Sequence, residues 1–383
     1  MNKLKTILII LIVSLSAKLF ATDFSVRIFS QSNIKSVSIT ALVGKYAMNG
    51  DDKPIIGIEK NEIVTISIEK NKLRIKKNKE DLGLFSTLEI AGDGLKNIFK
   101  IKPLNQDLNE RIYDDDIEIS IEKGVLKIIN NVDVEHYVAG VVQSEILGSC
   151  DSLEFFKVQA IISRTYAINN MRKHYKEGYN LCDDVHCQAY KSRCNNFQIL
   201  MATTLTAGDV IVDKNKHMIS AAFCSNSGGE TINSESLWSI PTTYLKAVVD
   251  TFSNGMRNST WEKKMPAKEW INYLKNSYNY PTDDTAMLRK AFNFEQLTRK
   301  IYFHDSIPLK SMRKDLELKS TFFSVKKEGE NVILKGRGYG HGVGLSQEGA
   351  IKMVRYRYKA HQIIKYYYKG VDIINYEEIK KID

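Results

Sequence analysis

A second long hydrophobic run is missing from this chain. Its 383 residues hold one conspicuous apolar stretch, TILIILIVSLSA, which follows the basic residues MNKLK. No other segment of spanning length follows, so we expect the rest of the chain to be soluble. The one stretch is short for a bilayer span, and its flanking residues are typical of a signal peptide. We predict a signal peptide at 1–21, cleaved after Ala21, and export to the periplasm or cell envelope; an uncleaved anchor is the alternative.

Cysteine is scarce, and its number is odd. Five cysteines in an exported chain exclude a disulfide framework that pairs all of them. The chain is also too long to need disulfides, since 43% of its residues are hydrophobic and can form an ordinary core. No internal repeat of fixed period is visible. The glycine-rich GHGVG lacks the Lys-Ser/Thr pair of a phosphate loop, which excludes that function for it.

Acidic residues are fewer than basic ones. The formal net charge is +10, and residues 1–21 contain Lys3, Lys5 and Lys18 but no acid, so the rest carries +7. A basic chain suits nucleic acid, but export argues against that partner, and we expect none. An anionic envelope polymer or membrane surface is the better partner. A lysine-rich solvated surface is the equal alternative.

The hydrophobic pattern divides the chain into regions. Short alternating or β-branched segments predict strands at first, and a helical period begins at Asn131. We expect an α+β protein with a β-rich N-terminal region followed by a mixed helix and strand domain that carries a helical insertion. The expected bounds are 22–125 for the β-rich region, 126–251 and 321–383 for the two parts of the mixed domain, and 252–320 for the insertion.

A glutamate lies on the apolar stripe of the first predicted helix. Asp133 opens this helix, and its apolar residues fall at helical spacing: Val134, Tyr137, Val138, Val141 and Val142. The next position on the stripe is Glu145. Since burial disfavours the charged form, we expect the pKa of Glu145 to be raised, which suits a general acid. A structural ion pair with Arg164 or a lysine is the alternative.

The second predicted helix begins with a possible capping box, in which Asp151 is the N-cap and Glu154 lies three residues later. Its polar residues form one stripe: Gln159, Ser163, Tyr166 and Asn170. This stripe is either a functional face or simply a solvated one.

Cysteine and histidine cluster between residues 174 and 194. Cys182, His186 and Cys187, together with Cys194 or His174, supply four ligands for a zinc ion. The spacing differs from that of a zinc finger, and such a zinc would be structural. A Cys182–Cys194 or Cys187–Cys194 disulfide, or free thiols, are the alternatives.

Several motifs occur in a specific order: VDVEHYVAGVVQSE, FFKVQAIISRTYAI, CQAY, CSNSGGET, LW and GRGYGHGVGLSQEGA. Together they resemble the family of the sporulation protein SpoIID and the amidase enhancer LytB, over roughly residues 120–250 and 320–370. The resemblance implies that Glu145 is the catalytic acid of a peptidoglycan lytic transglycosylase. It also implies that some relatives hold zinc near CQ. Family-pattern positions that we expect to bind substrate are Gln159, Arg164, Tyr166, Ser227, Gly228, Gly229, Thr231 and His341.

The resemblance is imperfect. Ile146 and Leu147 replace the Met-Pro pair that often follows the family glutamate, and Glu348 replaces an aromatic residue. The SpoIID branch cleaves glycan with one glutamate: the C6 hydroxyl of the sugar attacks its own anomeric carbon and leaves a 1,6-anhydro end. The LytB branch modifies amidases instead. We therefore expect peptidoglycan glycan strands as partner, and keep a non-catalytic amidase enhancer and a structural wall-binding protein as alternatives.

Overall fold

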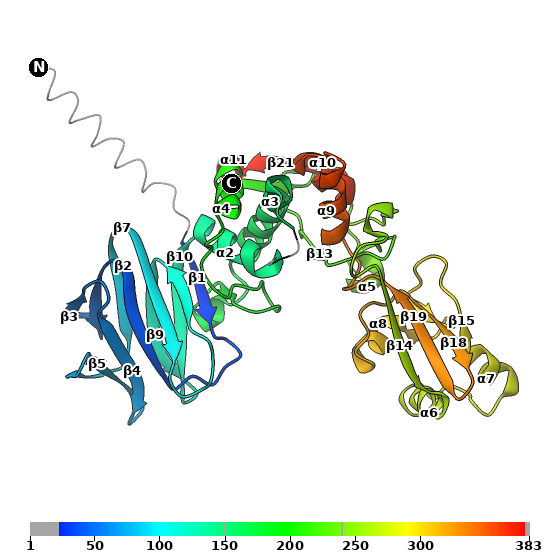
Figure 1. Cartoon of the computed structure of the whole chain (residues 1–383), viewed down its shortest axis with the longest axis horizontal. Coiled ribbons are helices and arrows are strands. Elements are labelled where there is room, and N and C mark those ends of the chain that lie inside the picture. The colour runs from blue at the N-terminus through cyan, green and yellow to red at the C-terminus, as the bar shows by residue number, and fades with distance from the viewer. Residues whose placement is uncertain (1–22, 147, 149, 239, 380–383) are drawn as a thin grey trace, which may run out of the picture. The chain divides into compact units, whose positions relative to one another are not determined.

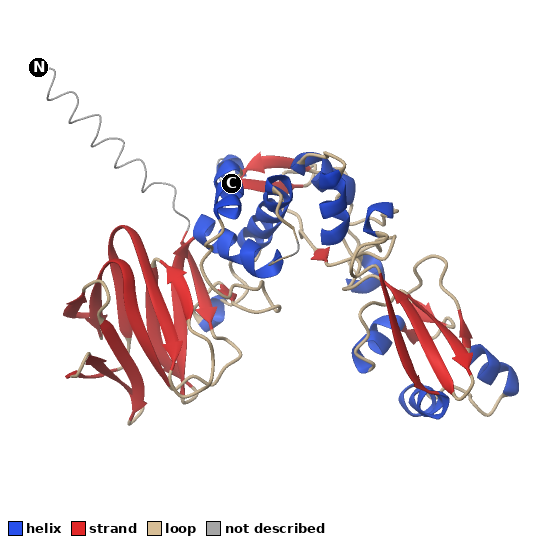
Figure 2. Ribbon diagram, in the orientation of Figure 1, coloured by secondary structure: helices blue, strands red, loops and turns tan. Residues whose placement is uncertain are grey.

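The computed structural model describes residues 23–146, 148, 150–238 and 240–379 (Figure 1). The predicted signal peptide lies outside these residues. Helices and strands are both abundant, which confirms the α+β class (Figure 2). The chain divides into two compact units, one ending at Ala207 and one beginning at Gly208. In the described part, no helix has the length and apolar character needed to cross a membrane.

The first unit contains a large sheet. Its strands are β1 (Asp23–Ile28), β2 (Ser36–Gly50), β3 (Lys53–Ile58), β4 (Ile63–Glu69), β5 (Lys72–Lys77), β6 (Glu80–Phe85), β7 (Leu88–Pro103), β8 (Arg111–Asp114), β9 (Asp116–Glu122), β10 (Val125–Asp133) and β11 (Leu181–Cys182). Their order is β11-β1-β10-β9-β7-β2-β4-β5-β6, with β3 on β2 and β8 on β7. Among the described strands of this sheet, β11 alone pairs in parallel, with β1.

Alternation of side chains explains these strands. In β2, Val37, Ile39 and Ala41 are buried, while the residues between them are partly exposed. A strand turns successive side chains to opposite faces, so this pattern buries one face of the sheet. The sheet continues through β10 to Asp133, beyond residue 125, where we expected the β-rich region to end.

The described part of the first unit also contains the helices α2 (Val134–Ile146), α3 (Leu153–Asn169) and α4 (Phe197–Leu205), with the short turn η1 (Tyr175–Glu177). The Asp133 carboxylate accepts hydrogen bonds from the backbone N–H groups of Glu135 and His136, at 2.8 and 3.4 Å. Asp133 therefore opens α2, as predicted.

The predicted capping box of α3 is wrong. The helix begins at Leu153 after Ser152, and no side chain caps its first turn. Glu154 instead pairs with Lys157, with 3.2 Å between the carboxylate and the ammonium group. The N-terminal groups of α3 thus lack the side-chain cap that the sequence suggested.

The second unit contains small sheets and short helices. Its strands are β12 (Asp209–Val212), β13 (Phe223–Cys224), β14 (Thr260–Pro266), β15 (Asn293–Phe294), β16 (Tyr302–Phe303), β17 (Ile307–Pro308), β18 (Phe323–Glu328), β19 (Asn331–Arg337), β20 (Leu345–Ser346) and β21 (Asp372–Asn375). Its helices are α5 (Glu235–Trp238), α6 (Ala267–Tyr278), α7 (Thr285–Ala291), α8 (Leu309–Asp315), α9 (Gln347–Arg355), α10 (Ala360–Tyr367) and α11 (Tyr376–Ile379), with the turn η2 (Thr251–Ser253).

Segment 252–320 is more than the helical insertion that we predicted. It holds α6, α7 and α8, but also β14 and β15, which pair with β19 and β18 from the region after residue 320. Trp270 and Phe303 share one hydrophobic core with Val325 and Leu334. The segment and the strands that follow it therefore fold together.

Candidate functional site

Glu145 lies in the last turn of α2, next to the loop that follows the cysteine and histidine cluster. The apolar stripe that leads to it is buried, as predicted. The loop can approach the helix closely because residue 140 is glycine. A Cβ at Gly140 would lie 2.5 Å from the ring of Tyr190, which is too close for any side chain.

Three consecutive side chains of α2 hold this loop through its backbone N–H groups. Glu145 Oε1 accepts from Ala189 at 3.0 Å, and Ser144 Oγ accepts from Lys191 at 3.1 Å. Gln143 Oε1 accepts from the N–H groups of residues 195 and 196, at 2.9 and 3.2 Å. The sequence gave no sign of these contacts, because they join a helix to a loop more than 40 residues away.

The Glu145 carboxyl is half-buried and has no salt bridge to any described residue. Burial raises its pKa above the usual value for glutamate, although the N–H of Ala189 and the charge of Lys191 oppose this shift. Among the described residues, the hydrogen bond from Ala189 is the one contact of its carboxylate, and it engages Oε1. No hydrogen bond from a described residue reaches Oε2.

Arg164, the expected alternative partner of Glu145, pairs with Glu135 instead. Its Nε lies 2.8 Å from Glu135 Oε1 and its Nη2 lies 2.5 Å from Oε2, so the pair is bidentate. The Arg164 side chain is completely buried and also donates to the carbonyl of Thr203 at 3.4 Å. Among the described contacts, Arg164 thus joins α2, α3 and α4, and its expected role in binding substrate stays a prediction.

The polar stripe of α3 is not a solvated face. Gln159 and Ser163 are fully buried, and the carbonyl of Ser163 accepts a hydrogen bond from Gln188 at 3.4 Å. Gln188 in turn accepts from the hydroxyl of Tyr137 at 3.2 Å. Gln159 is thus buried in this structure, and its expected contact with substrate stays a prediction. Tyr166 is half-buried, and burial raises its pKa.

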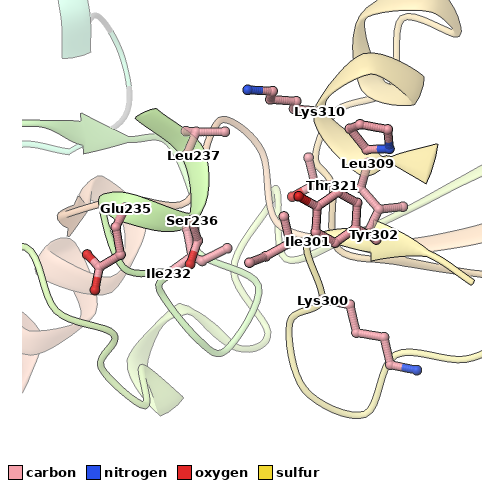
Figure 3. Close-up of a pocket in the computed structure, with 11 residues that line it drawn as sticks. Ile232, Glu235, Ser236, Leu237, Lys300, Ile301, Tyr302, Leu309, Lys310 and Thr321 are labelled. Carbon is pink, nitrogen blue, oxygen red and sulfur yellow. The ribbon is translucent and has the colours of Figure 1, made fainter. Parts of the chain in front are cut away.

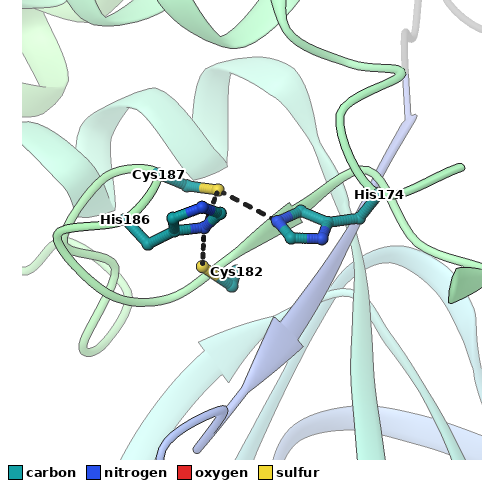
Figure 4. A group of neighbouring side chains, drawn as sticks. All are labelled: His174, Cys182, His186 and Cys187. Atoms are coloured by element: carbon teal, nitrogen blue, oxygen red, sulfur yellow. Dashed lines mark hydrogen bonds between the residues drawn. The ribbon is translucent and has the colours of Figure 1, made fainter.

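His174, Cys182, His186 and Cys187 come together in one cluster (Figure 4). All their ligand atoms lie within 4.8 Å of one another. Sγ of Cys187 is 3.5 Å from Nε2 of His174, and Nδ1 of His186 is 3.7 Å from the sulfur of each cysteine. The chain turns sharply enough for the adjacent residues His186 and Cys187 to face the same point.

This geometry fits zinc. Tetrahedral zinc, with Zn–S of about 2.3 Å and Zn–N of about 2.1 Å, separates neighbouring sulfur and nitrogen ligands by about 3.6 Å. His174 also has the outer support that metal-bound histidines usually have, because its Nδ1 lies 2.7 Å from Glu177 Oε1. The hydroxyl of Tyr179 donates to the other oxygen of Glu177 at 2.7 Å.

Cys194 does not belong to the cluster. Its buried thiol lies 3.6 Å from the carbonyl of Asn196, and neither Cys182 nor Cys187 forms a disulfide with it. Of the two ligands that the sequence left open, the structure places His174 in the cluster. The two clustered thiols interact: a hydrogen bond from Cys187 lowers the pKa of Cys182 to about 5, and the same contact raises the pKa of Cys187.

The glycine turn after β13, in the second unit, is an internal network. The Ser227 hydroxyl is buried and donates to Asp250 at 2.7 Å, while Thr231 Oγ1 accepts from the N–H of Val248 at 2.8 Å. The N–H groups of Gly228 and Gly229 are bound to Asn226 and Ser253, at 2.7 and 2.8 Å. These four residues therefore take part in internal hydrogen bonds, and the glycan contacts expected from them stay a prediction.

Gly228 is required by a close approach of two chain segments. It has a φ of +73°, and a Cβ there would lie 2.7 Å from the backbone of Arg337. Glu348, which replaces an aromatic residue of the family pattern, is buried at the same place. It accepts hydrogen bonds from the side-chain amides of Asn226 and Asn258, at 2.6 and 2.8 Å.

His341 faces the exposed Trp238, with 5.4 Å between the ring centres. Burial, helped by the charges of Arg313 and Arg299, lowers its pKa to about 4. Its Nδ1 accepts the N–H of Val343 at 3.0 Å, so the neutral ring carries its proton on Nε2. His341 is thus a neutral hydrogen-bond donor beside an exposed aromatic ring. The sequence motif LW was the available sign of this pairing.

A pocket of about 240 Å³ lies near this turn (Figure 3). Ile232 and Leu237 form one wall, and Ile301, Tyr302 and Leu309 form the other. The remaining lining residues include Glu235, Ser236, Lys300, Lys310 and Thr321. Half of this pocket comes from segment 252–320, for which the sequence had suggested no function.

Comparisons with known proteins agree with the motif order. The family model of the stage II sporulation protein SpoIID matches residues 122–212. An uncharacterized protein of Brachyspira hyodysenteriae is 26% identical over 93% of this chain and 97% of its own length. Stage II sporulation protein D of Bacillus amyloliquefaciens is 29% identical over 64% of this chain and 75% of its own. The amidase enhancer of Bacillus subtilis is 27% identical over 62% of this chain and 40% of its own. The ordered motifs, the matched region around Glu145 and these relatives together support the SpoIID/LytB family for this chain.

Proposed function

We propose that this protein is an exported lytic transglycosylase that cleaves the glycan strands of peptidoglycan, with Glu145 as its general acid and base. Family membership supports a role at the cell wall. The observation that carries the enzymatic proposal is the state of Glu145. Its carboxyl is half-buried, its pKa is raised, one oxygen is held by the N–H of Ala189, and no described cation pairs with it. A raised pKa increases the protonated fraction of the carboxyl at a given pH, and the protonated form is the general acid that glycosidic bond cleavage requires.

The chemistry balances with this one residue. Protonated Glu145 gives its proton to the glycosidic oxygen as the bond from that oxygen to the anomeric carbon breaks. The C6 hydroxyl of the same sugar then bonds to the anomeric carbon, and its proton passes to the Glu145 carboxylate. The products are a 1,6-anhydro end and a new free hydroxyl, and the enzyme returns to its starting protonation state. An ordinary glycosidase needs a second carboxylate, either to activate water or to act as a nucleophile. This route needs only Glu145.

The zinc that fits the cluster of His174, Cys182, His186 and Cys187 would hold the loop structurally and takes no part in these steps. The loop that contains Cys187 and Ala189 then positions the carboxyl of Glu145. Ala189 follows Cys187 by two residues, so a fixed Cys187 restrains the N–H that holds Glu145 Oε1. The loop therefore acts on catalysis by orienting the carboxyl.

Replacement of Glu145 by Gln tests the proposal. The amide keeps the size of the side chain but has no titratable proton, so we expect product formation to fall by roughly 10²-fold or more. Glu154→Gln changes a partly buried glutamate of α3 in the same way and should keep full activity. Purified peptidoglycan and peptide-free glycan strands are digested with each variant, and products are identified by mass spectrometry. Reducing ends in place of 1,6-anhydro ends, or a loss below about tenfold, would contradict the role of Glu145.

Likeness to the amidase enhancer favours a second candidate, a non-catalytic activator of a cell-wall amidase. The same variants separate the two functions. If wild type and Glu145→Gln release no anhydro sugar and stimulate a cell-wall amidase equally, the activator function is correct and the enzymatic proposal fails.

A further inference from the structure

The chain between Glu348 and Asp372 contains no acidic residue, although it carries many basic and aromatic ones. It forms α9, the turn at residues 356–359, and α10. Tyr356 and Tyr358, in the turn, are 63% and 38% exposed. Exposed aromatic rings of this size are informative, since most tyrosines place more of their ring inside the protein.

The aromatic rings here form a cluster around Phe252 of η2. The ring centre of Phe252 lies 6.1 Å from that of Tyr356, and 5.7 Å from those of Tyr358 and Tyr366. All three contacts are edge-to-face, with interplanar angles from 60° to 80°. Such contacts orient rings, so the exposed tyrosines are held in place by a partly buried neighbour.

Cations surround these rings, and three of the exposed ones have no acidic partner among the described residues. Arg355, Arg357 and Lys359 are exposed and make no salt bridge with any described residue. Lys352 donates to the carbonyl of Asn254 at 2.8 Å, and Lys369 lies over the ring of Tyr366 at 5.4 Å. On a surface of mixed charge, acidic residues usually lie among the basic ones. Asp372, the first acidic residue after Glu348, pairs with Lys365.

We propose that this cationic tyrosine surface, formed by Lys352, Arg355, Tyr356, Arg357, Tyr358 and Lys359, binds a negatively charged carbohydrate polymer of the cell wall. Guanidinium groups pair well with carboxylate and phosphate groups, often in bidentate fashion. The C–H faces of sugar rings pack on exposed tyrosine rings, and the phenol hydroxyl bonds to sugar hydroxyls. The surface retains the protein on its polymer, separately from bond cleavage at Glu145.

A membrane surface fits these residues less well. A protein segment that lies in the lipid interface inserts leucine, phenylalanine or tryptophan side chains beside its cations. From Arg355 to Lys359, every exposed side chain instead ends in a charged or hydroxyl group. Side chains that all end in a charged or hydroxyl group are suited to contact a hydrated polymer.

The test measures how the full-length mature protein co-sediments with insoluble cell wall. The variant Arg355→Gln with Arg357→Gln should bind roughly fivefold more weakly, because two cations each lose an ion pair with the polymer. The control Lys60→Gln with Lys79→Gln removes the same charge from exposed positions of the first unit and should bind like wild type. Tyr356→Ala should also weaken binding, whereas Tyr302→Ala, at another exposed tyrosine, should not.

Two treatments of the wall identify the anionic group. If binding falls when phosphate polymers are stripped from the wall, the partner is a phosphate polymer. If it falls when free carboxylates are blocked as amides, the partner is peptidoglycan with its stem peptides. Unchanged melting temperatures of the variants show that each is folded. Glu145→Gln should keep full binding, so failure of the catalytic proposal leaves this one standing.

Three results would overturn the proposal. The first is that the arginine variant binds the wall as tightly as wild type does. The second is that the lysine control loses as much binding as the arginine variant. Alternatively, vesicles with 30% anionic phospholipid or single-stranded DNA bind more tightly than wall, with the same dependence on Arg355 and Arg357.

Discussion

At the scale of single residues, Glu145 and Arg164 differ in what surrounds their charge. Arg164 is fully buried, and both of its charge-bearing nitrogens near Glu135 are used in a bidentate pair. Glu145 keeps one oxygen without a described partner. A paired buried charge supports structure, whereas a half-buried acid without a counter-ion can exchange a proton.

Replacement of Arg164 should therefore reduce stability first. Arg164→Ala removes the bidentate ion pair with Glu135 and contacts among three helices, so we expect the free energy of unfolding to fall by about 3–5 kcal/mol. Arg172→Ala, at an exposed position just after α3, should change it by less than about 0.5 kcal/mol. Denaturant unfolding measures both. A fully stable Arg164→Ala protein with lost activity would show instead that Arg164 acts on substrate.

At the scale of elements, the cysteine and histidine cluster joins β11 to the loop that contacts α2. The ligands come from the residue directly before η1, from β11 and from the loop after β11. An ion bound to all four would close this part of the chain, and its binding free energy would be part of the folding free energy.

Purified protein prepared without chelator should contain about one zinc per chain. Cys182→Ser removes a ligand, so we expect loss of the metal and a melting temperature lower by at least about 5 °C. Cys194→Ser, outside the cluster, should retain the metal. Elemental analysis and thermal unfolding check both variants. Absence of zinc from wild type, or its loss from Cys194→Ser alone, would contradict the ligand assignment.

The start of α2 carries a pH-dependent contact. Nδ1 of His136 lies 2.9 Å from Asp115, and this hydrogen bond raises the pKa of His136 to about 9. A folded pKa above the unfolded value of about 6.5 means that the contact stabilises the protein fully below pH 6.5 and is lost as pH rises to about 9. The melting temperature of His136→Asn should be lower than that of wild type at pH 6, and the difference should shrink by pH 9.5.

A matched control comes from an exposed histidine. The side chain of His217 is 80% exposed, so His217→Asn should follow the wild-type melting curve at both pH values. A wild-type advantage over His136→Asn that grows with pH would contradict the sign of the shift.

At the scale of the whole molecule, the sequence predicted those features that depend on residues close together in the chain. Alternation predicted the strands, the apolar stripe predicted burial beside Glu145, and Asp133 was recognised as a helix start. The sequence did not predict the strand pairings and ion pairs that join segments far apart in the chain. Strands β14 and β15 are short or polar, and they acquire their role by pairing with β19 and β18. The partner of Arg164 was missed for the same reason, since Glu135 lies 29 residues earlier.

Export is a property of the whole chain that remains a prediction. If residues 1–21 are a signal peptide, protein recovered from the cell envelope should begin near Thr22. Mass spectrometry of the purified protein measures this start. An intact Met1 on protein recovered from the cytoplasm would contradict it.

The contact between Gly140 and Tyr190 limits which residue this chain can carry at position 140. The space beside Gly140 is smaller than one methyl group. Its occupant, the Tyr190 ring, belongs to the residue directly after Ala189, which holds the carboxyl of Glu145. An alanine at position 140 would leave every titratable group in the sequence unchanged and still displace the peptide whose N–H bonds to Glu145. Under the proposed function, the orientation of the acid therefore depends on a residue that has no side chain and takes part in no reaction.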